Sequence, residues 1–212
     1  MTEAVGEGDA FFRGVTVEGA VIVRGGGENS VHFEDSVLVR IVVDKPTGTV
    51  RILVAGASSV EEVVVQSSVK LEESHLTDIG FKNVSLAETL PVGSQVELSG
   101  HFESMSVMSA DIKVNLTSGA IDELHAYPAA SGLELEMAAN AIIADLVLDA
   151  LANVTGEGKV TRATLSPEAA SDSATEGSGS ASSTDGGSTP EPHSESGPSP
   201  VGRRADLYKL GD

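Results

Sequence analysis

The sequence predicts an all-β fold, a right-handed parallel β-helix (solenoid) of about seven coils, followed by a disordered C-terminal tail. Two observations support this prediction. A six-residue pattern recurs seven times: a large apolar residue, two mainly small or polar residues, and then an apolar-x-apolar step. Apolar residues also alternate within the copies, which places their side chains on one face of a strand.

The spacing of the copies indicates stacked units. Their first positions are separated by 21, 27, 21, 21, 19 and 22 residues. A repeat of about twenty residues is typical of units that bury their apolar face only against their neighbours. The copies begin at Phe12, Phe33, Val60, Phe81, Phe102, Ile121 and Ile143.

Two details set the expected alignment of the coils. We interpret the 27-residue step, which contains the turn sequence 45–48, as a coil with an enlarged corner. His-Phe-Glu occurs at 32–34 and again at 101–103. This recurrence predicts that Phe33, Phe81 and Phe102 stack in one apolar column.

Each unit is expected to hold three short strands joined by corners. In the first copy the alternating residues are Val15, Val17, Val21 and Val23, and β-branched residues of this kind suit a half-buried pleated surface. The corners are rich in glycine and proline, which favour turns. They are the segments 25–27, 45–48, 91–93 and 118–119.

Two alternatives to this fold are open from the sequence. Residues 140–154 fit a seventh coil by register, but their apolar residues also fit the spacing of a capping helix that begins at Asn140 and ends at Gly156. A β-sandwich also has short alternating strands, although it predicts no relation between successive units.

Composition divides the chain into four parts. We expect a short disordered N-terminus at 1–10, a solenoid domain at 11–166, a disordered acidic Ser/Gly/Pro linker at 167–201 and a short recognition peptide at 202–212. In that peptide, arginine, leucine and tyrosine return after a long stretch without them, which predicts a contact with a protein partner. The candidate partner-binding residues are Arg203, Arg204, Leu207, Tyr208 and Leu210.

The charge balance argues against nucleic-acid binding. The chain has 32 acidic and 13 basic residues and a net charge of −19, so its field repels phosphate backbones. The acid excess suits a salt-rich, halophilic cytoplasm, where carboxylates keep the surface hydrated. Neither a signal-peptide pattern nor an apolar membrane span is visible, so we expect a cytoplasmic protein, with membrane contact at most peripheral at the inner face.

The sequence contains no obvious catalytic constellation. Cysteine is absent, and the coil register does not predict a cluster of the five histidines. The acidic pairs 61–62 and 122–123 recur at one place in the pattern, where solvation explains them better than glycoside hydrolysis does. We therefore expect no enzyme activity, no catalytic residues, no cofactor and no metal site. A carbohydrate-binding or carbohydrate-active solenoid is an alternative, although only seven aromatic residues are available for stacking.

A cysteine-free, one-domain solenoid with a low-complexity tail resembles the bactofilins and, given the acid excess, their archaeal relatives the halofilins. The resemblance covers Phe11 to Leu165. It implies a polymer-forming cytoskeletal scaffold that affects cell shape, needs no nucleotide and assembles end to end through apolar coil faces. The residues that this places at the ends are Phe11, Phe12, Leu146, Leu148 and Leu151. A monomeric adaptor that acts through the C-terminal peptide is the other possibility.

Overall fold

Strands with alternating apolar residues form the coils of this protein. The computed structural model describes residues 8–25, 31–77 and 79–167. Within them every element is a parallel β-strand, and each strand before β13 pairs with a strand one coil further along. The strands are β1 (Ala10–Arg13), β2 (Thr16–Val23), β3 (Val31–Glu34), β4 (Val37–Val43), β5 (Val50–Gly56), β6 (Ser59–Val65), β7 (Val69–Leu76), β8 (Phe81–Leu86), β9 (Gln95–Val107), β10 (Lys113–Ala126), β11 (Leu133–Met137), β12 (Ala141–Leu148), β13 (Ala152–Gly156) and β14 (Lys159–Leu165).

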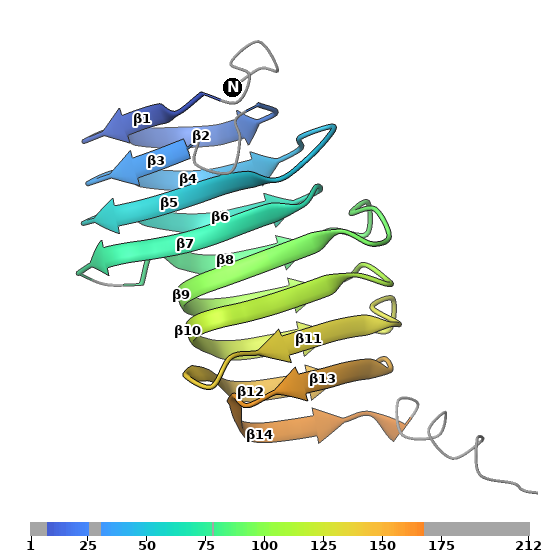
Figure 1. Cartoon of the computed structure of the whole chain (residues 1–212). Coiled ribbons are helices and arrows are strands. Elements are labelled where there is room, and N and C mark those ends of the chain that lie inside the picture. The colour runs from blue at the N-terminus through green and yellow to red at the C-terminus, as the bar shows by residue number, and fades with distance from the viewer. Residues whose placement is uncertain (1–7, 26–30, 78, 168–212) are drawn as a thin grey trace, which may run out of the picture. The chain divides into compact units, whose positions relative to one another are not determined.

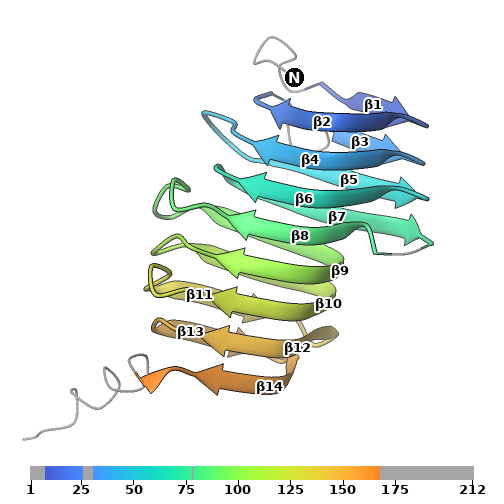
Figure 2. The same cartoon turned by 180° about the vertical axis from the view of Figure 1, so that it is seen from behind.

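The strands wind into a right-handed solenoid (Figures 1 and 2). The chain crosses the front face in β1, β3, β5 and β7, and returns across the rear face in β2, β4, β6 and β8. β9 and β10 are long enough to run through both faces. One buried column passes through eight residues, so the chain makes seven turns between its first and last members. The column is Val17, Leu38, Val60, Phe81, Phe102, Ile121, Ile143 and Val160.

Each coil holds two hydrogen-bonded segments rather than the three strands expected from the sequence. The third straight segment is the second half of the rear strand, which begins at a bend. In β6, Val60, Val63 and Val65 are buried while the two residues between Val60 and Val63 face outward. The spacing of the six-residue pattern therefore encodes this bend within one rear strand.

The alignment of the first two copies was wrong. Leu38, not Phe33, pairs with Val60, and it lies 22 residues before it. Phe33 belongs to the front sheet, where it pairs with Phe12 and Val54. The 27-residue step therefore joins a front-sheet residue, Phe33, to a rear-sheet residue, Val60, and does not mark an enlarged corner. The two His-Phe-Glu sequences are not equivalent, because the first lies in the front sheet and the second lies where Phe102 enters the rear sheet.

A two-residue insertion lies one coil later, between β7 and β8. Eight residues separate Glu72 from Phe81, compared with six between Leu53 and Val60 in the coil before and only two between Ser99 and Phe102 in the coil after. Figure 1 shows that β7 extends further than β9 at this edge. The pairing of β7 with β9 accordingly stops at Glu72.

The segment 140–154 forms strands. The prediction of a seventh coil is therefore confirmed, and the alternative of a capping helix is wrong. β12 and β13 occupy this region, and β14 follows as a further rear strand. The sequence analysis missed β14, although Val160, Ala163 and Leu165 repeat the apolar spacing of the pattern. The last coil therefore lies beyond the seventh copy.

The core is one continuous apolar cluster inside the coils. Its polar corners are satisfied by stacked serines. The Ser58 hydroxyl lies 2.7 Å from the carbonyl oxygen of Ala55 and 3.1 Å from that of Phe33, either of which can accept its one proton, and it accepts from the backbone N–H of Ser36 at 3.0 Å. The Ser36 hydroxyl accepts in turn from the N–H of Val15. These hydrogen bonds join three successive coils at one corner.

Candidate functional site

Ion pairs on the outer surface join each coil to the next. Residues about one coil apart in sequence lie either directly above one another or two positions apart along the paired strands, so a charge on one coil meets its partner on the following coil. Each pair named here has this arrangement: Arg13–Glu34, Arg24–Asp44, Arg40–Glu62, Arg51–Glu72, Lys70–Glu97, Lys82–Glu61, Lys113–Glu136, His101–Asp122, His125–Asp149 and Arg162–Asp145. Basic residues are thus used to hold neighbouring coils together.

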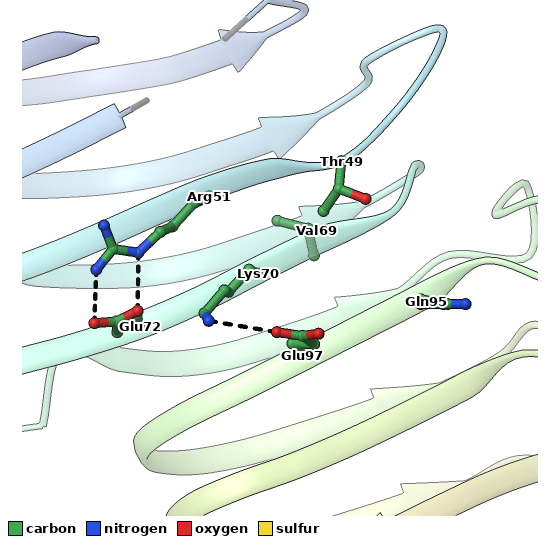
Figure 3. Close-up of a pocket in the computed structure, with 7 residues that line it drawn as sticks. All are labelled: Thr49, Arg51, Val69, Lys70, Glu72, Gln95 and Glu97. Atoms are coloured by element: carbon green, nitrogen blue, oxygen red, sulfur yellow. Dashed lines mark hydrogen bonds and ion pairs between the residues drawn. The ribbon is translucent and has the colours of Figure 1, made fainter. Parts of the chain in front are cut away.

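A polar hollow of about 550 Å³ opens on the front face over β5, β7 and β9. Figure 3 shows two ion pairs crossing it, Arg51 with Glu72 and Lys70 with Glu97. The Arg51 guanidinium donates two hydrogen bonds to Glu72, at 2.8 and 2.7 Å. The lining contains no aromatic side chain on which a sugar ring could stack.

The electrostatics of this hollow do not suit acid catalysis. Hydrogen bonding to Arg51 lowers the pKa of Glu72, and the same contact raises the pKa of Arg51. A carboxylate held in its ionised form cannot act as the general acid that glycoside hydrolysis requires. We therefore interpret these residues as links between coils.

Glu73 is the carboxylate that holds the insertion between β7 and β8. Its Oε1 accepts from the backbone N–H groups of Gly80 and Phe81, at 2.9 and 3.0 Å, and its Oε2 accepts from that of His101 at 2.7 Å. Burial raises the pKa of Glu73, and these three hydrogen bonds oppose the rise. Both carboxylate oxygens thus accept hydrogen bonds from backbone N–H groups. The role of Glu73 is to hold the connection between β7 and β8 against β9.

The glycines next to Glu73 make room for it. A Cβ on Gly100 would lie 2.6 Å from Cγ of Glu73, and a Cβ on Gly80 would lie 2.8 Å from its Oε1. Sequence reasoning did not identify Glu73. The only signal in the sequence was a charged residue where the alternation of β7 calls for an apolar one, after Val69 and Leu71.

His32, His101 and His125 take part in separate contacts. His101 pairs with Asp122 at 2.8 Å and His125 pairs with Asp149 at 2.7 Å, each at the surface. His32 stacks on Phe11, with ring centroids 4.5 Å apart. No three His, Asp or Glu side chains among the described residues come close enough together to hold a metal ion. In the same residues no helix is long and apolar enough to cross a membrane.

The two ends of the solenoid are open in the described part of the chain. There β1 and β2 pair only with the second coil, and β13 and β14 pair only with the coil before them. The inward faces of the last coil remain accessible: Leu165 is 56% exposed and Val154 is 38% exposed. Among the described residues, the last coil therefore combines an edge that no further strand covers with exposed apolar side chains, the combination that templates further strand pairing.

The residues expected at the ends have different positions. Phe12 lies inside the first coil against Phe33, whereas Phe11 points outward and is 55% exposed. Leu146 and Leu148 are buried because Ala163 and Leu165 of the last coil lie on them. Leu151 lies in the turn before β13 and is 40% exposed.

The terminal apolar surface is therefore formed by Val154, Val160 and Leu165, which the sequence analysis did not select. The expected recognition peptide at 202–212, the expected linker beyond Pro167 and residues 1–7 of the expected N-terminal segment lie outside the described residues.

Comparison with known proteins identifies one structural neighbour and no family. No protein-family model and no curated protein matches the chain. Part of a solved structure is similar to it: chitinase ChiW from Paenibacillus sp. str. FPU-7, described as a bacterial cell-surface-expressed multi-modular enzyme machinery. The match has 30% sequence identity and a TM-score of 0.62, and it covers 73% of this chain. It spans only 16% of the chitinase chain, so it concerns one part of that enzyme.

Proposed function

We propose that this chain is a non-enzymatic scaffold of the bactofilin or halofilin type, which self-associates end to end in the cytoplasm or at the inner face of the membrane. In this proposal the assembled solenoid affects cell shape or positions its partners. The observation that carries it is the pair of open ends. In the described part of the chain no further strand covers the first or the last coil, and the last coil exposes apolar side chains of the core.

The chemistry of the surface favours growth along the solenoid axis over lateral association. Apolar residues of the core, such as Leu165, are exposed on the last coil, where stacking would remove them from water. The flanks carry the acid excess of a chain whose net charge is −19. Like charge opposes contact between flanks, more weakly as salt increases.

Assembly is tested by sedimentation velocity across protein concentration and by electron microscopy of the full chain at high salt. We expect the sedimentation coefficient to rise with concentration and filaments to form. Leu165→Asp places a charge on the exposed apolar end and should weaken assembly. Val92→Asp is the matched control, since Val92 is 72% exposed in a turn away from both ends. Persistent monomers at high concentration would contradict the proposal.

We also propose that the C-terminal peptide recruits a protein partner. The support is its composition, with Arg203, Arg204, Leu207, Tyr208 and Leu210 following an acidic, low-complexity stretch. Deletion of 203–212 should abolish partner recruitment and leave the far-ultraviolet circular dichroism and assembly unchanged. If the protein is monomeric and this deletion removes its cellular function, the chain is instead an adaptor that acts through the peptide.

The similarity to part of a chitinase favours a second candidate function, a carbohydrate-associated module. Under this alternative the front face over β5, β7 and β9 would contact a glycan. Titration of the full chain with chito-oligosaccharides, followed by calorimetry, tests it. Saturable binding that is weakened by Arg51→Ala would support the carbohydrate module and count against the scaffold as the sole function.

A further inference from the structure

One strand of the rear face presents a row of apolar side chains to solvent. Val37, Val39 and Val42 of β4 point away from the core, and Val37 and Val39 are each 48% exposed. Val64 of β6 pairs with Val42 and also lies on the outer side, between two buried residues. β4 and β6 are neighbours on the rear face (Figure 2). We call these four residues the rear valine patch.

The same places in the following coils are polar. The column that contains Val42 and Val64 continues outward with Ser85, Ser106 and His125. Outward side chains take no part in core packing, so apolar residues are not needed at these places to form the solenoid. An apolar patch rimmed by polar residues is typical of a surface that another molecule covers.

We infer that the rear valine patch binds a second copy of this chain, in a back-to-back dimer whose two solenoids run in opposite directions, with Arg40 of each copy forming an ion pair with Glu62 of the other. The two-fold axis would run along the strands, midway between β4 and β6. β4 of each copy would then face β6 of the other. This contact goes beyond the proposed end-to-end assembly and does not depend on it.

The charges beside the patch select this arrangement. Arg40 and Glu62 pair across β4 and β6, two residues before Val42 and Val64. Their side chains are 51% and 36% exposed, and the Arg40 Nε donates to Glu62 at 2.5 Å. In the dimer Val42 of each copy packs on Val64 of the other, and each guanidinium contacts two carboxylates. The contact is therefore self-complementary, as a two-fold interface requires.

Solenoids that run in the same direction would lose these ion pairs. In that arrangement β4 faces β4 of the second copy, and the outward residues of β4 are three valines and Arg40. Arg40 would then meet no acidic side chain across the contact. The guanidinium would lose water without gaining a partner, which is unfavourable.

The overall acid excess also favours the antiparallel arrangement. Residues 8–60 contain six acidic and five basic side chains, whereas residues 61–167 contain sixteen and five. A contact centred between β4 and β6 keeps the acidic coils after β8 of the two copies at opposite ends of the dimer. This part of the flank therefore escapes the like-charge repulsion that opposes other lateral contacts.

Sedimentation equilibrium of the full chain tests the inference, with Leu165→Asp in every protein so that end-to-end assembly does not obscure the dimer. We expect a monomer–dimer equilibrium. Val42→Asp should raise the dissociation constant of the dimer at least tenfold, because it buries a charge in the contact. Ser106→Asp is the matched control, since Ser106 occupies the same outward column outside the contact, and it should change the constant by less than about twofold.

Charge reversal tests the direction of the two copies. Arg40→Glu and Glu62→Arg should each raise the dissociation constant by roughly three- to tenfold at low salt, and less at high salt. The double variant should return to within about twofold of the starting protein. A mixture of the two single variants should also recover, because one copy is then acidic at both places and the other is basic at both.

The outcomes separate this inference from end-to-end assembly. A dimer that ignores Val42→Asp, or whose charge variants recover neither in the double variant nor in the mixture, overturns the inference. Monomers at all concentrations overturn it as well. If deletion of 168–212 then produces dimers, the chain's own C-terminal segment covers the patch instead. Growth beyond a dimer without Leu165→Asp tests end-to-end assembly separately.

Discussion

Phe81 and Phe102 stack face to face on successive coils, with ring centroids 5.6 Å apart and an interplanar angle of 7°. Both side chains are fully buried, and their backbones pair directly between β8 and β9. This contact lies just below the insertion that follows β7. The rear sheet thus keeps its register past the insertion, because Phe81 pairs with Val60 on the coil before and with Phe102 on the coil after.

Replacing one of these rings should be costly. Phe102→Ala leaves a cavity under Phe81, and we expect the free energy of unfolding to fall by about 3–5 kcal/mol. Phe11→Ala is the matched control, because its ring is on the outer surface, and its loss should stay below about 1 kcal/mol. Urea denaturation followed by circular dichroism measures both. Equal losses in the two variants would contradict a core position for Phe102.

Glu73 should control the stability of the insertion between β7 and β8. Glu73→Gln replaces one acceptor oxygen by an amide nitrogen that faces backbone N–H groups. We expect a loss of about 1–3 kcal/mol in the free energy of unfolding at neutral pH. Glu103→Gln, at an exposed position, should change it by less than about 0.5 kcal/mol. Hydrogen exchange at Gly80, Phe81 and His101 should accelerate in the Glu73→Gln variant.

The pH dependence of stability should carry the signature of Glu73. Its pKa in the folded protein is raised above the unfolded value of 4.5, so the folded state binds this proton more tightly. The contribution of Glu73 to the free energy of unfolding therefore increases as pH falls through the folded pKa, and it levels off below 4.5. The difference between the unmodified protein and Glu73→Gln should show this trend in denaturation curves measured across pH. A difference that is constant with pH would refute it.

Arg51 and Glu72 should be coupled more strongly than a fully exposed pair. Their side chains are 20% and 24% exposed, against 68% and 51% for Arg13 and Glu34. Double-mutant cycles with alanine should give a coupling of about 1 kcal/mol for the first pair and about 0–0.5 kcal/mol for the second. Because Arg51 lowers the pKa of Glu72, its stabilisation is present above 4.5 and is lost as pH falls through the folded pKa. Cycles with equal coupling would contradict this difference.

Gly119 should not tolerate a side chain. Its φ is +96°, and a Cβ would lie 1.9 Å from the carbonyl oxygen of Gly100 on the preceding coil. Gly119→Ala should therefore lower the free energy of unfolding by about 2–5 kcal/mol, through backbone strain and steric overlap. Gly19→Ala is the control, because nothing lies within 4 Å of its Cβ position, and it should be neutral or slightly stabilising. A neutral Gly119→Ala would show that the coils can separate at this corner.

The sequence by itself determined the fold class and the period, because alternation and a repeat of about twenty residues are local properties that a parallel solenoid must have. It also indicated the strand at 140–154 through the match of register. It did not determine which residues stack. That depends on the length of every corner, and the insertion at 73–80 and the bend inside the rear strands look alike in a one-dimensional pattern.

Only the tertiary structure therefore separated Phe33 from the column of Phe81 and Phe102 and added the last coil. It also brought together charges about one coil apart in sequence, such as Arg51 and Glu72. The physical reason is that the contacts between coils are long-range, and side-chain packing inside the solenoid fixes the register between them.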